Sequence, residues 1–367
     1  MGYSTFREQV GKWGDLRSLA RYRDEVLRPH PRLRHLFFEV TSDCNEYCRH
    51  CGSRCGDYFA ENPLTDEEIR HVMDTVAEDF AGRLPMLCIT GGEPLLRDGL
   101  CDLMAYAAGK SFSWGMTSNA TLITPDVARD LRESGMRTIS VSLDGLRDDH
   151  DWFRQVPGCY DEAVGGIHAL VAEARKGGIQ HVQVTSVITK RTIGKLDAMY
   201  DEIAKLGVRS WRVINIEPIG RAKEQPELLL APEDYRRLMD FIVTHRHAGA
   251  MEVCYGCSHY LGVDLEGRTR DWDFICSAGV MTASITAGGD IVSCLDVERR
   301  PELVEGNVRT DRFGDVWRDG FVRYRTDWRK VGKCARCALW HVCAGDSFHS
   351  WNFDEMRPEL CMKGILF

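Results

Sequence analysis

The chain has 367 residues, of which 44% are hydrophobic and 28% are charged, and its formal net charge is −8. Because the charges are spread along the chain, the sequence does not predict a surface that grips nucleic-acid phosphates. No window has the apolar length of a signal peptide or a membrane span, so we expect a cytoplasmic protein without a nucleic-acid or membrane partner.

Short apolar runs alternate with longer amphipathic runs over much of the chain. The short runs predict six strands, over 36–42, 86–90, 113–118, 137–143, 181–188 and 211–216. The longer runs predict helices over 65–80, 99–109, 124–135, 160–178 and 195–207. Strands that alternate with helices are typical of βαβ units and a parallel sheet. The sequence therefore predicts an α/β fold with a partial (β/α)6 TIM-like barrel over 36–225, preceded by a leader or helix over 1–35.

The alternation changes after residue 220. A helix is predicted over 232–247, within a helical linker over 226–253, and two β-rich runs around AGGD predict a hairpin over 280–294. Residues 254–367 are rich in cysteine and glycine and have little apolar sequence of their own. We therefore expect a second, small domain there that is organised by metal.

Fifteen cysteines are a high number for a chain of this size without a signal sequence, and they indicate metal-binding thiolates rather than disulfides. Twelve of them fall in three groups, at 44–55, 254–294 and 334–361. The other three are isolated, and we interpret Cys88, which lies in an apolar run, as a buried structural thiol.

The first group reads CNEYCRHC over 44–51 and follows the first predicted strand. Cys44, Cys48 and Cys51 have C-x3-C-x2-C spacing. Three thiolates in one loop suit a [4Fe–4S] cluster whose fourth iron stays open to a cofactor or substrate. A zinc site, which usually draws on two cysteine pairs, is the alternative. Cys55 could close the cluster site, but we interpret it as a spare or structural thiol.

Further motifs follow the next predicted strands, namely GGEP at 91–94, TSNA at 117–120 and SLDG at 142–145. The carboxyl ends of barrel strands meet at one mouth, where we expect these motifs to join the cysteine loop. The CNEYCRHC, GGEP and SLDG motifs resemble those of the radical S-adenosylmethionine (SAM) enzymes. The C-terminal cysteines resemble the SPASM extension of that family, which carries auxiliary iron–sulfur clusters.

The resemblance implies a [4Fe–4S] cluster that binds SAM and, with one electron, cleaves it to methionine and a 5′-deoxyadenosyl radical. The radical then abstracts a hydrogen atom from the substrate. An electron donor such as flavodoxin or ferredoxin is also implied. The residues expected to bind the cofactor are those that match the family's motifs: Gly91, Gly92, Glu93, Pro94, Asn119, Ser142, Asp144 and Arg154.

These residue types suit the roles that the resemblance gives them. The two glycines let the backbone approach the methionine end of SAM, and Glu93 accepts a hydrogen bond from the methionine amine. Ser142 and Asp144 suit the ribose hydroxyls, and Arg154 suits the methionine carboxylate. For the last three residues, turn capping or surface charge is the alternative.

Four C-terminal cysteines have the SPASM spacing and make a complete set for one auxiliary [4Fe–4S] cluster, with zinc as the alternative: Cys334, Cys337, Cys343 and Cys361. The cysteine that the family usually has next is replaced here by Ser347. This departure leaves the ligands of another auxiliary cluster incomplete.

Cys276 and Cys294 must therefore draw partners from elsewhere, and Cys254 and Cys257 are the available thiols. Either all four bind one cluster, or three of them, including Cys257, bind it and leave an iron open. A free Cys254 could donate a hydrogen atom to a substrate radical. Asp346 is a further candidate, as an oxygen ligand.

The first hypothesis for the substrate, which rests on the family, is a ribosomally made peptide that is crosslinked, oxidised or epimerised. Only 43 residues precede the first cysteine, so a separate leader-peptide-binding protein or direct groove binding would be needed. Other members of the family act on sugars, aminoglycosides or porphyrin-like substrates, so radical dehydrogenation or epimerisation of a carbohydrate or other small molecule is an alternative. An iron–sulfur electron carrier without SAM chemistry is a third hypothesis, although a carrier has no use for GGEP and SLDG.

Overall fold

A computed structural model describes residues 6–57, 59–271 and 274–367. The strands of these residues are β1 (His35–Glu39), β2 (Met86–Thr90), β3 (Trp114–Ser118), β4 (Met136–Ser142), β5 (His181–Ile188), β6 (Ser210–Asn215), β7 (Glu252–Tyr255), β8 (Thr282–Ile285), β9 (Asp290–Val292), β10 (Gly306–Asn307), β11 (Trp351–Asn352) and β12 (Arg357–Pro358). Ten of them form one sheet in the order β10-β9-β8-β1-β2-β3-β4-β5-β6-β7, and β11 pairs with β12.

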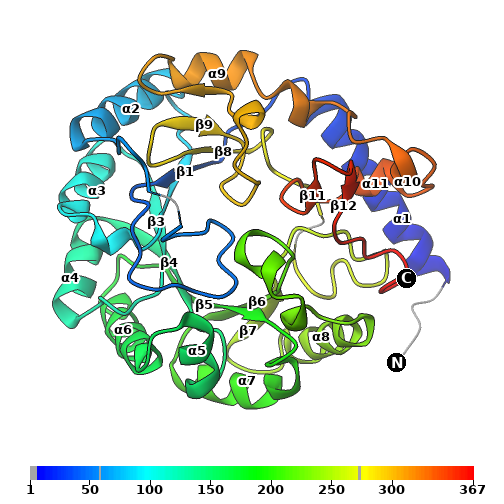
Figure 1. The fold of residues 1–367 in the computed structure, drawn as a ribbon, viewed down its shortest axis with the longest axis horizontal. Helices are drawn as coiled ribbons and strands as arrows, with labels where there is room; N and C mark the ends of the chain where they lie inside the picture. Colours follow the sequence, from blue (N-terminus) through cyan, green and yellow to red (C-terminus); the bar gives the residue numbers. More distant parts are fainter. Residues whose placement is uncertain (1–5, 58, 272–273) are drawn as a thin grey trace.

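Most helices lie outside this curved sheet, so that strands line the inside of an incomplete ring (Figure 1). The α-helices of the described residues are α1 (Phe6–Arg21), α2 (Asp66–Asp79), α3 (Leu100–Gly109), α4 (Pro125–Glu133), α5 (Arg147–Arg154), α6 (Cys159–Ala174), α7 (Leu196–Lys205), α8 (Pro232–His245), α9 (Phe313–Asp319), α10 (Gly332–Ala335) and α11 (Trp340–Cys343). None of the described helices has both the length and the apolar character to cross a membrane.

The predicted partial barrel is confirmed. Strands β1 to β6 are parallel neighbours in chain order. The ends of the predicted strands agree with the observed ones within one residue, except that β1 ends at Glu39 and not at residue 42. Threonine caps begin two of the predicted helices. Thr65 and Glu68 form a capping box at the start of α2, and Thr124 accepts a hydrogen bond from the backbone N–H of Val127 at the start of α4. Helix α5, which follows SLDG, was not predicted.

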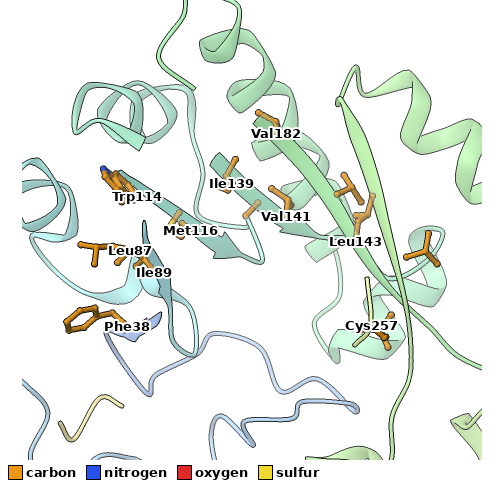
Figure 2. Packing of buried hydrophobic residues seen from close by; sticks show 14 of the residues in the cluster. Phe38, Leu87, Ile89, Trp114, Met116, Ile139, Val141, Leu143, Val182 and Cys257 are labelled. Carbon is orange, nitrogen blue, oxygen red and sulfur yellow. The ribbon is translucent and has the colours of Figure 1, made fainter. Parts of the chain in front are cut away.

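Alternate residues of the strands form the core between the sheet and the helices. Figure 2 shows this row of side chains across neighbouring strands, from Phe38 through Leu87 and Trp114 to Ile139 and Val182. All five are nearly inaccessible to solvent. Period-two burial is what a sheet with one face covered by helices requires. The other face is left free to line the interior of the barrel.

Two features of the sheet differ from the sequence prediction. Strand β7 continues the parallel sheet beside β6, and the expected hairpin, present as β8 and β9, joins the same sheet because β8 pairs parallel with β1. Both were missed as sheet members because β7 has only four residues and because the partner of β8 is very distant in sequence. The expected boundary at residue 254 falls within β7, and the domain limits remain a prediction.

The buried Glu39 at the end of β1 strengthens this long-range pairing. Its carboxylate accepts a hydrogen bond of 2.9 Å from the backbone N–H of Ala287 and forms an ion pair with Arg299. Because the cysteine loop begins directly after β1, residues more than 240 positions further along the chain help to position it.

Candidate cofactor and cluster site

The three cysteines of the first motif lie in the loop after β1. Burial raises the pKa of Cys44 to about 11 and raises the pKa of Cys48 well above its ordinary value, and Cys48 interacts electrostatically with both Cys44 and Cys51. Three desolvated thiolates this close together are costly without a cation. An iron–sulfur cluster supplies the compensating positive charge, so these donors fit the predicted cluster.

A single zinc ion fits them less well. Sulfur atoms around one zinc lie about 3.8 Å apart, as follows from a Zn–S distance of about 2.3 Å. In the described part of the chain, the groups of donors near enough to share one ion are Glu46–His150–Cys159 and Glu217–His259–His349, and neither contains these three thiols. The wider spacing favours a cluster of several atoms.

Cys55 lies beside the same loop. Its backbone N–H donates to Sγ of Cys51 at 3.4 Å, and a hydrogen bond from its thiol lowers the pKa of Cys51. The same hydrogen bond to Cys51 raises the pKa of Cys55 above the ordinary value of a thiol. This arrangement suits the interpretation of Cys55 as a structural group.

The GGEP motif packs directly against the cysteine loop. The backbone N–H groups of Gly92 and Glu93 donate to the carbonyl oxygens of Thr41 (2.9 Å) and Asp43 (2.8 Å). A Cβ atom on Gly92 would lie 1.9 Å from the carbonyl oxygen of Asp43, and one on Gly91 would lie 2.5 Å from that of Thr41. The glycines are therefore required for contact with the loop, whatever space they also leave for SAM.

Glu93 connects the ends of β2 and β3. One oxygen accepts a hydrogen bond from the Ser118 hydroxyl (2.9 Å) and the other from the backbone N–H of Asn119 (2.8 Å). Burial raises the pKa of Glu93 to about 7. Asn119 in turn donates to Oδ1 of Asn45 in the cysteine loop (2.8 Å), while Pro94 opens a short 3-10 helix. The GGEP and TSNA motifs thus meet the cysteine loop at one mouth, as expected.

The SLDG motif joins this group through charge. Arg154 in α5 donates from Nη1 to Oε2 of Glu46 and from Nε to Oδ2 of Asp144, both at 2.8 Å. Burial alone would raise the pKa of Asp144, but the Arg154 guanidinium holds it below its ordinary value. Ser142, at the end of β4, is half-buried. The expected contacts of Asp144 and Arg154 with SAM remain a prediction, since in this structure the two side chains bind each other.

Arg221 is a positioning residue that sequence reasoning missed. It lies in a 3-10 turn after β6, and its guanidinium donates to the carbonyl oxygens of Cys48 and Cys55, each at 2.8 Å. Its backbone N–H donates to the carbonyl oxygen of Cys51 at 3.1 Å. No local pattern signals this role, because it depends on a contact between distant segments.

The four cysteines of the predicted auxiliary site lie together. Cys334, Cys337, Cys343 and Cys361 all line one cavity of about 440 Å³, next to α10, α11 and the C-terminal segment. Cys334 interacts electrostatically with Cys361 and Cys337, and Cys343 with Cys361. A cavity lined by four thiols fits an auxiliary [4Fe–4S] cluster.

The remaining candidates lie in different surroundings. Cys276 and Cys294 interact with each other, whereas Cys257 lies 3.8 Å from the backbone carbonyl oxygen of Asn215 and interacts with Glu217. Cys254 lies within β7 beside Arg212, and burial raises its pKa to about 11. The thiol of Cys254 is therefore protonated at neutral pH, as a hydrogen-atom donor must be.

Replacing Cys343 by alanine is expected to remove about four irons per chain, the content of one auxiliary cluster, and to leave the cysteine loop loaded. Iron and sulfide analysis of anaerobically reconstituted protein measures this. Cys101→Ala, an isolated cysteine in α3, is the matched control and should keep its iron. Zinc in place of iron at this site would contradict the prediction.

A large cavity of about 790 Å³ adjoins the cysteine loop. Its wall includes Gly52–Arg54 of that loop, Ile219 and Lys223 of the turn after β6, and residues 292–301 after the hairpin. The C-terminal segment contributes His349 and Trp351. A ligand in this cavity would lie between the cysteine loop and the C-terminal region.

Comparisons with known proteins match this arrangement. The model of the radical SAM superfamily matches residues 38–203, and that of the SPASM iron–sulfur cluster-binding domain matches residues 276–338. The chain is 28% identical over 336 residues to an AdoMet-dependent heme synthase of Oleidesulfovibrio alaskensis, covering 86% of this chain and 82% of that protein. It is 26% identical over 339 residues to the mycofactocin maturase MftC of Mycolicibacterium smegmatis, covering 90% and 82%.

A solved structure shares the fold. SuiB of Streptococcus suis, bound to its precursor peptide SuiA, superimposes with a TM-score of 0.71 at 18% identity, covering 95% of this chain and 79% of that one. The two matched domains contain the cysteine loop and the first part of the C-terminal cysteine set. Their cofactors are a [4Fe–4S] cluster with SAM and auxiliary iron–sulfur clusters. The chain therefore carries a radical SAM domain and a C-terminal SPASM iron–sulfur domain, and these two domains indicate a radical SAM enzyme.

Proposed function

We propose that this radical SAM enzyme modifies a tetrapyrrole that carries carboxylate groups. The observation that supports this most is the cavity of about 790 Å³ beside the cysteine loop. Its volume is within the range of about 300–1,000 Å³ that is usual for sites of compact ligands. A flat, largely apolar macrocycle with charged edges matches such a site.

The cavity wall combines apolar, cationic and acidic side chains. The apolar ones include Ile219, Val292, Leu295, Val297, Leu303, Tyr324 and Trp351, the cationic ones are Arg54, Lys223, Arg299 and Arg300, and the acidic ones are Asp290, Asp296, Glu298 and Glu359. Lys223 forms only a loose ion pair, 4.0 Å from Glu298, and both side chains are more than two-fifths exposed. Such a pair contributes little to stability, so a substrate carboxylate can replace Glu298 as the partner of Lys223.

The relatives are consistent with this substrate class. The heme synthase that resembles the chain over most of its length is named for a tetrapyrrole product. Peptide modification, the first hypothesis from the sequence, stays a second candidate. It is favoured by the likeness to the mycofactocin maturase and to an enzyme solved with its precursor peptide.

The chain's own residues would prepare the reaction. The cluster and SAM, when bound, supply a radical that removes a hydrogen atom. Cys44, Cys48 and Cys51 hold the cluster, Gly91–Glu93 fix the loop around it, and the adjacent cavity holds the substrate. An auxiliary cluster can accept the electron that remains on the substrate, and flavodoxin or ferredoxin is the proposed reductant.

The test is substrate-dependent cleavage of SAM by the anaerobically reconstituted enzyme with dithionite. Iron porphyrins with free carboxylates should raise 5′-deoxyadenosine formation and change in mass, while their methyl esters should not. Lys223→Ala should weaken porphyrin binding about fivefold, or about 1 kcal/mol, without loss of iron. Stimulation by peptides alone would instead support the second candidate, and no 5′-deoxyadenosine under any condition would contradict both.

A further inference from the structure

Glu217, His259 and His349 bring three metal-binding side chains together from distant parts of the chain. Oε1 of Glu217 lies 2.8 Å from Nε2 of His259 and 3.0 Å from Nε2 of His349. The three donor atoms all lie within 4.8 Å of one another. Glu217 follows β6, His259 follows β7, and His349 precedes β11, so the group lies where the barrel meets the C-terminal region.

The group is buried and incompletely satisfied. His259 is fully buried, and Glu217 is 7% exposed. Among the described residues, Oε2 of Glu217 has no hydrogen-bond partner although it is buried. A buried carboxylate oxygen without a partner is costly, and a cation would remove that cost.

Asp346 contacts the second ring nitrogen of His259. Its Oδ2 lies 2.9 Å from Nδ1 of His259, and its Oδ1 accepts a hydrogen bond from the backbone N–H of Tyr260 at 3.1 Å. A carboxylate on the second ring nitrogen is what orients a metal-binding histidine and fixes its tautomer, so that Nε2 can present its lone pair. The structure therefore places Asp346 against His259.

We propose that Glu217, His259 and His349 bind one divalent transition-metal ion, such as Zn²⁺ or Fe²⁺, distinct from the iron–sulfur clusters. Two imidazoles and one carboxylate are a donor set that both ions accept, with a further position left open. In a tetrahedral site with bonds of about 2.0–2.1 Å, the donors lie about 3.3 Å apart. The two contacts to Oε1 of Glu217, at 2.8 and 3.0 Å, need to lengthen by only a few tenths of an ångström to reach this separation.

The open coordination position of the proposed ion has access to the large cavity beside the cysteine loop. His349 lines the cavity of about 790 Å³, and its side chain is 16% exposed. Water or an oxygen atom of a ligand in the cavity can therefore complete the coordination. This inference does not depend on which substrate the cavity binds.

The test uses the holoenzyme with its clusters intact. After equilibration with Zn²⁺ and desalting, the wild type should retain about one zinc per chain, and X-ray absorption should show nitrogen and oxygen neighbours at about 2.0–2.1 Å without sulfur at about 2.3 Å. His349→Ala and Glu217→Gln should lose this zinc while keeping their iron. Asp346→Asn should weaken zinc binding by about 10–100-fold.

His341→Ala, which alters an exposed histidine in α11, is the matched control and should bind zinc as the wild type does. His349→Ala carries the test if the more deeply buried Glu217→Gln fails to fold, and retained iron verifies that the chain is folded. Zinc that survives His349→Ala, zinc bound through sulfur, or no retained zinc in the wild type would each overturn the proposal. The four side chains would then form a buried ion-pair network only.

Discussion

Cys51→Ala is expected to reduce 5′-deoxyadenosine formation to background, a loss of at least about 1,000-fold, or about 4 kcal/mol. The loop has three thiols to hold its cluster, and Sγ of Cys51 accepts a hydrogen bond from the backbone N–H of the neighbouring Cys55. Without Cys51, only two of the three ligands remain. Iron analysis and the rate of SAM cleavage, measured on anaerobic protein with dithionite, give the result.

Cys55→Ala provides the control for that substitution. It changes a neighbouring buried thiol in the same loop, so it matches Cys51→Ala in position and size. We expect it to keep its cluster iron and most of its SAM cleavage, because a structural thiol is not a ligand. Loss of iron in Cys55→Ala, or SAM cleavage retained in Cys51→Ala, would show that the ligands of the loop are assigned wrongly.

Arg154→Met is expected to lower the free energy of unfolding by about 3–5 kcal/mol. Methionine preserves much of the volume of the side chain, but it leaves the buried carboxylates of Asp144 and Glu46 without their cation. Removing one partner of a buried ion pair is costly because the remaining charge stays desolvated. The midpoint of chemical denaturation under anaerobic conditions measures the loss.

The loss of unfolding free energy in Arg154→Met should become smaller as the pH falls. The pKa of Asp144 is lowered in the folded wild type, so its ion pair contributes stability above the unfolded pKa of about 3.9 and loses it as the pH falls through the folded value. In the variant, an unpaired buried carboxylate takes up a proton more readily. The difference in the free energy of unfolding between Arg154→Met and the wild type should therefore be largest near pH 7 and smaller near pH 5.

Arg129→Met is the matched control for Arg154→Met. Arg129 pairs with Asp126 on the surface of α4, with both side chains exposed, and its removal should cost at most about 0.5 kcal/mol. An equal loss in both variants, or a difference that grows as the pH falls, would contradict the account of the buried pair.

The parts of the fold that the sequence predicts are those set by local patterns. MLCIT forms β2 over the predicted residues because a short, continuous apolar run bounded by turns is typical of a strand in a parallel sheet. Thr65 starts α2 because its side chain satisfies a backbone N–H that the helix leaves free. The ligand spacing of Cys44, Cys48 and Cys51 is equally local, since one loop contains all three.

What the sequence could not predict depends on contacts between distant segments. Arg221 lies over 160 positions from the loop carbonyls that it binds, and nothing around it signals that role. The ion pairs of Arg154 with Glu46 and Asp144 also join separate segments of the chain. Glu217, His259 and His349 come from three segments, and His259 follows a strand too short to be recognised by periodicity.

The pairing of β1 with β8 bears on how the protein is made. Ala287, which binds Glu39, is 248 positions further along the chain. At synthesis rates of about 5–20 residues per second, roughly 12–50 s pass before the ribosome has added it. During that interval one edge of β1 has no partner, and an unpaired edge invites association with other nascent chains. A chaperone that shields this edge until the C-terminal third emerges should increase the yield of active protein.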